Sequence, residues 1–158
     1  MDLVLWRHAQ AHDAEPGCDD LSRPLTSKGE GQAARVAKWL DRQLPDSTRV
    51  LVSPARRAEQ TARALGRKFK FRDELAPEAS ADDALAFIKW TTENGPSQKG
   101  AVLLVGHQPM FGQIAARLLG VAESACDMRK GAVWWLRSRH HNEVVQVSLL
   151  TVISPDLI

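Results

Sequence analysis

Short apolar runs alternate along the chain with segments in which apolar residues recur at helical spacing. The short runs are rich in Val and Leu and are bounded by polar or turn residues, which is typical of strands buried in a parallel sheet. They cover residues 3–6, 50–52 and 101–105. The helical segments cover residues 33–44, 58–65, 83–93 and 111–118, and Ser53-Pro54 supplies an N-cap and first position for the second helix.

The pattern changes in the C-terminal part of the chain. Residues 132–137 and 144–152 predict two strands, and residues 138–142 predict the turn of an antiparallel hairpin. Strands and helices alternate before that point, which favours parallel pairing through crossover helices. We therefore expect a three-layer α/β/α sandwich whose sheet is mostly parallel with an antiparallel C-terminal edge, and one domain over residues 1–158.

Composition fits this fold and excludes several classes of function. The 158 residues are 44% apolar and 25% charged, as in ordinary soluble globular proteins. A net charge of +2 gives no electrostatic footprint for nucleic acid. The two distant cysteines, Cys18 and Cys126, disfavour a disulfide-stapled module and a four-thiolate zinc site. The pattern contains no signal peptide or membrane segment, so we expect a cytoplasmic monomer with reduced cysteines and no membrane contact.

Candidate chemistry lies directly after the predicted strands. Ligands of open α/β sheets bind at the carboxyl ends of the strands, so residues that follow these strands share one edge. This edge receives two histidines and up to three arginines: Arg7, His8, Arg56, Arg57 and His107. Gly106 precedes the second histidine, and we include it among the substrate-binding residues. No carboxylate directly follows any of the three strands.

Arginines and histidines in this arrangement favour a phosphate site. Cations in the first turn of a helix, such as Arg56 and Arg57, oppose the helix dipole unless an anion binds there. Guanidinium groups pair with phosphate through two parallel hydrogen bonds. Neutral imidazole attacks phosphorus and forms a phosphohistidine that water hydrolyses, while neighbouring cations stabilise charge on the phosphoryl oxygens. This chemistry requires no metal or other cofactor, because the protein supplies the positive charge.

Other clusters receive ordinary interpretations. His8 and His12 have the spacing of a zinc-binding pair, but the spacing falls in a predicted loop and not on a helix. His140-His141 falls in the predicted hairpin turn, as exposed surface. A basic stretch predicts a solvated face, with recognition of an acidic partner as the alternative: Arg63, Arg67, Lys68, Lys70 and Arg72.

Four motifs, in order, resemble those of the histidine phosphatase superfamily, which includes phosphoglycerate mutases. They are Arg7-His8-Ala9; Leu25-Thr26 with Gly29, Gln32 and Ala33; Val52-Ser53-Pro54 with Arg57-Ala58 and Gln60-Thr61; and Gly106-His107-Gln108-Pro109. The resemblance implies a phosphoglycerate mutase-like fold, with His8 as nucleophile and Arg7, Arg57 and His107 as phosphate ligands. Arg56 is out of register with the family's arginine and becomes a neighbour of the site.

Within the superfamily, the short chain is most similar to the SixA-type phosphohistidine phosphatases. Phosphoglycerate mutases and many acid phosphatases are longer and carry insertions that cover the site. The resemblance implies hydrolysis of phosphohistidine on a protein partner, a phosphotransfer domain. An open, shallow site suits such a substrate.

Two positions depart from the superfamily's pattern. Ala9 replaces a more common glycine, with little effect expected unless the backbone needs a positive φ. Pro77 stands where larger members carry the glutamate that protonates a leaving oxygen, so the candidates for a general acid are Glu78, Asp19 and Asp20. An imidazole leaving group, with a reference pKa of about 6.5, needs less help than an alkoxide. The missing acid therefore favours a substrate with a P–N bond.

Two other functions stay open at the level of sequence. The same chemistry on small phosphate esters or sugar phosphates calls for a covered pocket with a positioned acid. A phosphate-binding interaction module would keep the pocket without turnover, although the complete set of His8, Arg7, Arg57 and His107 argues against lost turnover. A mutase is disfavoured, because nothing in the sequence resembles a lid that retains the phosphorylated intermediate.

Overall fold

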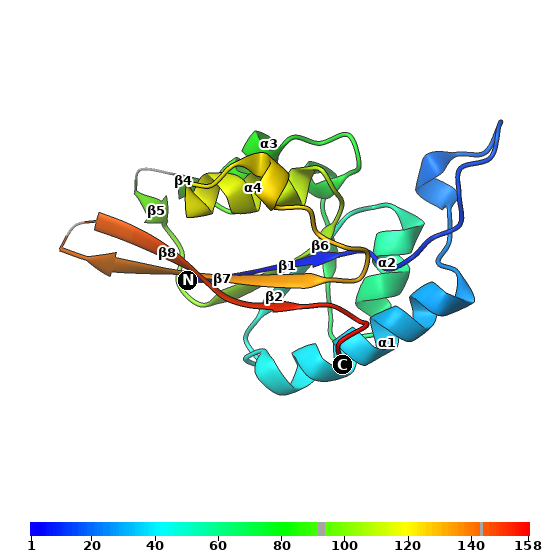
Figure 1. Cartoon of the computed structure of the whole chain (residues 1–158), viewed down its shortest axis with the longest axis horizontal. Helices are drawn as coiled ribbons and strands as arrows, with labels where there is room; N and C mark the ends of the chain where they lie inside the picture. Colours follow the sequence, from blue (N-terminus) through cyan, green and yellow to red (C-terminus); the bar gives the residue numbers. More distant parts are fainter. Residues whose placement is uncertain (92–93, 143) are drawn as a thin grey trace.

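A six-stranded sheet forms the middle of the molecule, and helices cover both of its faces (Figure 1). The computed structural model describes residues 1–91, 94–142 and 144–158. The strand order is β3-β2-β6-β1-β7-β8, in which the first four strands run parallel and the last two pair antiparallel. The strands are β1 (Asp2–Arg7), β2 (Arg49–Val52), β3 (Lys70–Phe71), β6 (Ala101–Gly106), β7 (Val133–His141) and β8 (Val144–Ile153).

Helices pack on each face of this sheet. One face carries α1 (Ser27–Gln43) and α2 (Arg56–Arg63), and the other carries α3 (Ala81–Phe87) and α4 (Met110–Leu119). Short 3-10 turns connect them: η1 (Asp20–Ser22), η2 (Asp73–Leu75) and η3 (Glu123–Ala125). The predicted three-layer α/β/α sandwich with an antiparallel C-terminal edge is confirmed. Within the described ranges, the helices are all too short or too polar to cross a membrane.

The apolar run of β1 is buried from both sides. Leu3 and Leu5 belong to the core under α3 and α4, and Val4 and Trp6 belong to the core under α1 and α2. All four side chains are 0% exposed, and burial of one such side chain stabilises the fold by about 1.5–3 kcal/mol. Because β1 lies between β6 and β7, both cores fix the position of its carboxyl end.

The third helix is shorter than the sequence predicts. The prediction of a helix over residues 83–93 was wrong, since α3 ends earlier and Lys89 adopts a left-handed φ of 55°. The chain then forms a small separate sheet of β4 (Trp90–Thr91) and β5 (Gly95–Pro96). Trp90 is buried in the core under α3 and α4, so tertiary packing overrides the local helical pattern. Glu93, the predicted end of that helix, lies outside the described residues.

The C-terminal hairpin is present, but the predicted position of its turn was wrong. Strands β7 and β8 pair from Val133 and Ile153 to His141 and Val144, so residues 138–141 belong to β7. These residues lack an apolar alternation, and only backbone pairing with β8 reveals them as strand. Ser138 is buried, and its N–H donates to the Met1 carbonyl (3.0 Å). The start of the chain is thereby tied to the hairpin.

Candidate active site at the strand ends

Three parallel strands end side by side and bring the candidate residues to one edge of the sheet. Arg7, the last residue of β1, pairs with Gly106, the last residue of β6. The N–H of His8 then donates to the Gly106 carbonyl (2.9 Å), and the N–H of Ser53 donates to the Val105 carbonyl (2.9 Å). His107 directly follows β6, and the ring centroids of His8 and His107 lie 5.1 Å apart. The fold thus places the two histidines next to each other.

A hydrogen bond fixes the tautomer of His8. Its Nδ1 lies 2.7 Å from the carbonyl oxygen of Ala9. A carbonyl oxygen only accepts, so Nδ1 carries the hydrogen and Nε2 presents a lone pair. Ala9 is buried and is not among the described residues with a positive φ, so the glycine of related proteins is not needed at this position. The lone pair on Nε2 of His8 is therefore not engaged by this hydrogen bond.

His107 is held by a buried serine. Its Nε2 lies 2.7 Å from the hydroxyl oxygen of Ser53, which also accepts from the N–H of Ala55 (3.2 Å). The prediction that Ser53-Pro54 caps the second helix was wrong, because α2 begins at Arg56 and its N-cap is Ala55. The hydroxyl of Ser53 instead orients the second histidine of the site.

Arg57 is buried, although it stands in the first turn of α2. Its two terminal nitrogens donate to the carbonyl oxygen (2.8 Å) and carboxylate (3.0 Å) of Asp20 in η1. Arg23 donates to the other carboxylate oxygen of Asp20 (2.9 Å). The neighbouring Arg56 is exposed, which agrees with its place outside the family's register. The loop after β1 therefore closes over the site through Asp20.

The second arginine of the site is anchored from the opposite side. A terminal nitrogen of Arg7 donates to the carbonyl of Met128, in the segment that leads to β7. Four buried side-chain polar atoms of the described residues have no hydrogen-bond partner, and two of them are the Nε atoms of Arg7 and Arg57. A buried donor without an acceptor costs about 1–3 kcal/mol. Both arginines therefore have donors left for an oxyanion.

Burial and positive charge keep both histidines neutral. Desolvation, followed by the charges of Arg57 and Arg7, lowers the pKa of His8 to about 3, although its bond to the Ala9 carbonyl acts in the opposite direction. Desolvation is also the main reason that the pKa of His107 falls to about 3, with His8 and Arg57 adding to it. A neutral His8 has a lone pair available at physiological pH.

Asp20 stays ionised beside these groups. Burial raises the pKa of its carboxyl group, but hydrogen bonds from Arg23 and Arg57 outweigh that effect, and the pKa lies below its ordinary value. The side chain is half exposed to solvent. An ionised carboxylate cannot donate a proton to a leaving group. Asp20 is therefore a partner of Arg57 in this state and not a general acid.

Two polar side chains fix the loop that follows β1. Thr61 on α2 accepts from the N–H of Ala9 (3.1 Å) and donates to the carbonyl of Arg57 (2.7 Å). Gln32 on α1 accepts from the N–H of Gln10 (3.0 Å). A Cβ on Gly29 would lie 1.9 Å from the carbonyl oxygen of Gln10, so only glycine allows α1 to approach this loop. These contacts account for three motif residues outside the histidine and arginine cluster: Gly29, Gln32 and Thr61.

The remaining sequence candidates lie outside this arrangement or have local roles. Glu78 is exposed. Asp19 accepts from the N–H of Leu21 and caps η1. Gly106 lies within β6, and a Cβ there would come within 2.9 Å of the ring of Phe111. Within the described ranges no cluster of three or more His, Cys, Asp or Glu side chains could hold a metal ion.

Sequence reasoning missed contributions from a distant segment. The N–H of Gly131 donates to the His8 carbonyl (3.0 Å), and the carbonyl of Gly131 accepts from the indole of Trp6 (3.2 Å). The same segment supplies the Met128 carbonyl, and the charge of Lys130 helps to lower the pKa of His8. No local motif marks residues 128–131, because they reach the site only through the pairing of β7 with β1.

The fold and the site define an α/β protein with an imidazole–guanidinium site at the carboxyl edge of its sheet, and the chain is similar to several known proteins. The family description of the histidine phosphatase superfamily (branch 1) matches residues 3–79. Phosphohistidine phosphatase SixA of Escherichia coli (strain K12) is 32% identical over 124 residues, which are 75% of this chain and 74% of that protein. An uncharacterised protein of Picosynechococcus sp. is 33% identical over 144 residues, 87% of this chain and 86% of that protein.

A solved structure agrees with these sequence relatives. The structure of the protein histidine phosphatase SixA complexed with tungstate matches 99% of this chain and 99% of that chain, with a TM-score of 0.76 and 26% identity. The chain therefore belongs to the histidine phosphatase superfamily, and it is a phosphatase.

Proposed function

We propose that this protein is a metal-independent phosphatase that hydrolyses protein phosphohistidine through a covalent phosphohistidine on His8. The carrying observation is the bond from Nδ1 of His8 to the Ala9 carbonyl (2.7 Å), which leaves Nε2 as the nucleophile. The names of the SixA-type relatives support phosphohistidine as the substrate. We place the partner among phosphotransfer domains, and the enzyme in the cytoplasm as a single-domain monomer.

In the first step, Nε2 of His8 attacks phosphorus and the P–N bond of the substrate breaks. The substrate imidazole departs neutral when its other ring nitrogen carries a proton. The Nε–H groups of Arg7 and Arg57 have no acceptor in the free protein, and phosphoryl oxygens supply one. His107, whose ring centroid lies 5.1 Å from that of His8, serves as a third ligand. These donors stabilise the negative charge that spreads over the phosphoryl oxygens.

In the second step, water attacks phosphorus and the P–N bond to His8 breaks. The proton on Nδ1 stays with His8 throughout, because the Ala9 carbonyl holds it. His8 therefore also departs as neutral imidazole, and both protons of the water leave with the phosphate. Both bonds that break are P–N bonds with an imidazole leaving group, so one arrangement of donors serves both steps.

Hydrolysis of small phosphate esters is the competing function, and the state of Asp20 disfavours it. An alkoxide leaving group needs a proton donor. Arg23 and Arg57 hold Asp20 in its ionised form, and Glu78 is exposed. Glu78→Gln is therefore expected to leave turnover of phosphohistidine intact. Loss of ester hydrolysis in Glu78→Gln would reveal a working acid for esters and contradict the preference for P–N substrates.

The direct test measures loss of phosphate from a phosphohistidine-labelled phosphotransfer domain in the presence of a chelator. We expect fast turnover by the wild type and a loss of roughly 10⁴-fold or more in His8→Ala, since removal of a nucleophile has effects of that order. A phosphoserine peptide and p-nitrophenyl phosphate are run beside it. Faster turnover of the esters would favour the small-ester phosphatase, and no turnover of any of the three would favour the phosphate-binding module.

A further inference from the structure

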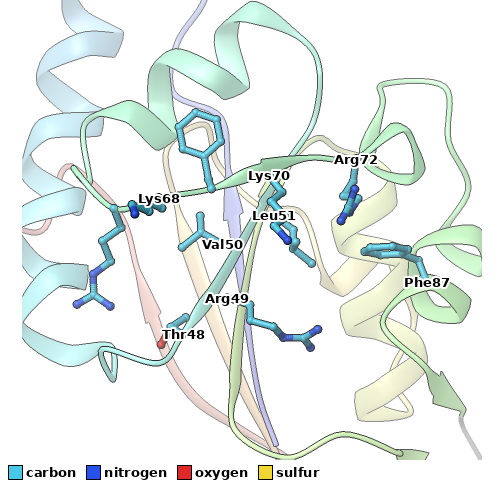
Figure 2. A pocket seen from close by; sticks show the side chains of 10 residues that line it. Thr48, Arg49, Val50, Leu51, Lys68, Lys70, Arg72 and Phe87 are labelled. Carbon is cyan, nitrogen blue, oxygen red and sulfur yellow. The ribbon is translucent and has the colours of Figure 1, made fainter.

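A second group of basic side chains surrounds a cavity where β2 and β3 form the edge of the sheet (Figure 2). The cavity has a volume of about 550 Å³. Five of its ten lining residues are basic and none is acidic: Arg49, Arg67, Lys68, Lys70 and Arg72. Four of these belong to the stretch that the sequence predicts as a solvated face. None of the four is buried, and the fold gathers them around a concave site, which we call the edge cavity.

Most of these cations lack an acidic partner. Arg67 pairs with Asp41 (3.2 Å). The ion pairs found within the described residues include none of the other four cations. In addition, the Nε atom of Arg72 is buried and has no hydrogen-bond partner there. Unpaired like charges in one cavity repel one another, and a bound anion reverses that cost.

Aromatic and backbone contacts hold one of the arginines in place before any ligand binds. The guanidinium of Arg72 lies 5.2 Å from the ring centroid of Phe87 and donates to the Phe71 carbonyl (3.2 Å). Figure 2 shows Arg49 and Arg72 on the same side of β2 as Phe87, with Lys68 on the other side. The cations flank the strand and do not converge on one point, which suits an elongated anion better than a single phosphate.

The edge cavity is separate from the catalytic site. Strand β3 pairs only with Leu51 and Val52 of β2. Arg49, at the start of β2, lines the cavity, whereas Ser53 follows the other end of the strand. Ser53 lies four residues after Arg49 along extended chain, which corresponds to about 13 Å. An anion at Arg49 therefore binds apart from His8 and His107.

We infer that the edge cavity binds a small oligophosphate. Guanidinium groups match phosphate oxygens with paired donors, and lysines add point charges. The volume falls within the range of about 300–1,000 Å³ that is typical of small-molecule sites. An acidic protein segment would also be attracted by the charge, but a concave site of this size fits a small molecule better than the surface of a folded protein.

The test uses calorimetric titration of inorganic tripolyphosphate into the His8→Ala chain in low salt with a chelator. The background variant prevents turnover, so the result does not depend on the proposed catalytic function. We expect the double substitution Arg49→Gln with Lys70→Gln to weaken binding about tenfold or more. The matched control, Lys38→Gln with Arg139→Gln, removes the same charge from exposed positions elsewhere and should change binding less than about twofold.

Two further arms locate the ligand and identify its class. Amide chemical shifts are expected to move at Arg49, Leu51 and Arg72. Binding that is lost in Arg57→Ala and retained in the Arg49 and Lys70 variant would place tripolyphosphate at the catalytic site and overturn the inference. Tight binding of a hexaglutamate peptide without binding of tripolyphosphate would also overturn it, in favour of an acidic protein segment. Equal binding of ATP and tripolyphosphate would support recognition through phosphates alone.

Discussion

Arg49, which begins β2, and Arg57, in the helix that follows β2, are in opposite physical states. At the carboxyl end, Arg57 is 3% exposed, and Asp20 occupies its terminal nitrogens. At the other end, Arg49 is exposed and has no ion pair among the described residues. The first arrangement aims donors at a fixed point in a medium of low dielectric. The second offers charge to an anion that remains in contact with water.

The contrast shows why similar side chains serve different purposes in one small fold. Donors that are buried and preorganised stabilise charge that develops during a reaction, because they need not reorganise. Exposed cations attract ligands, but salt at moderate ionic strength largely screens this attraction at separations beyond about 10 Å. The buried end of β2 is therefore suited to stabilising charge that develops in a reaction, and the open end is suited to binding alone.

The largest difference is expected between adjacent arginines of α2. Arg57→Gln should lower kcat/KM for a phosphohistidine substrate by about 10²–10³-fold, as removal of a donor to a developing oxyanion does. The matched control, Arg56→Gln, should stay within about twofold, because Arg56 is exposed. Steady-state kinetics of both variants measure this difference in kcat/KM. Similar losses in the two variants would mean that the net charge of the helix start matters and that the buried position of Arg57 does not.

Acid should lower the free energy of unfolding, mainly through His8 and His107 at the carboxyl edge of the sheet. The pKa of both His8 and His107 is about 3 in the folded protein, against 6.5 ordinarily. Between these values the unfolded state binds more protons, so the free energy of unfolding falls as pH decreases from about 6.5. Each histidine contributes up to about 1.4 kcal/mol per pH unit.

Urea denaturation at a series of pH values from 7 to about 4 measures this slope. His107→Gln should flatten it by roughly half, whereas His140→Gln, at an exposed position of β7, should leave it unchanged. The carboxylates whose pKa is lowered, such as Asp20, titrate below their ordinary value of 3.8 and act mainly below this window. A slope that His107→Gln does not alter would show that the imidazoles are not buried neutral.

Two hydroxyl groups at opposite ends of β2 provide a smaller contrast. Ser53→Ala removes the partner of His107 and should lower kcat/KM about tenfold, mainly through kcat, because the imidazole loses its orientation. Thr48→Ala removes a comparable hydrogen bond, from the hydroxyl to the Pro45 carbonyl (2.6 Å), and should leave kcat/KM within about twofold. Unfolding measurements check that both variants stay folded at the assay temperature. Equal kinetic losses would indicate a general loss of stability.

The smallest expected effect is the response to salt. Raising ionic strength tenfold should weaken tripolyphosphate binding to the His8→Ala chain several-fold, since the cations of the edge cavity are mostly exposed. Turnover of a short phosphohistidine peptide by the wild type should change less than twofold, because Arg7 and Arg57 are largely shielded from solvent. Equal salt dependence of both processes would contradict the proposed difference in solvent exposure between the two groups of cations.

The proximity of the two histidines could be predicted because strand ends obey a simple geometric rule. The runs before His8 and His107 are apolar and parallel, so both histidines had to meet at one edge. The layers and the antiparallel edge followed from the alternation of elements. Contacts between distant segments were beyond this reasoning, as the Met128 carbonyl at Arg7 illustrates.

The incorrect predictions for three segments have a common physical cause. Ser53 looked like a helix cap because capping and ligand positioning use the same residue type after a strand. Trp90 continued a helical pattern, although burial against α4 decided its conformation. The end of β7 looked like a turn because exposed strands need no apolar alternation when backbone pairing holds them. In each case a tertiary contact outweighed the local signal.

The hydroxyl group of Thr61 joins two parts of the catalytic site mechanically. It accepts from the N–H of Ala9, next to His8, and donates to the carbonyl of Arg57. One buried hydroxyl group therefore sets the spacing between the backbone next to His8 and the backbone of Arg57.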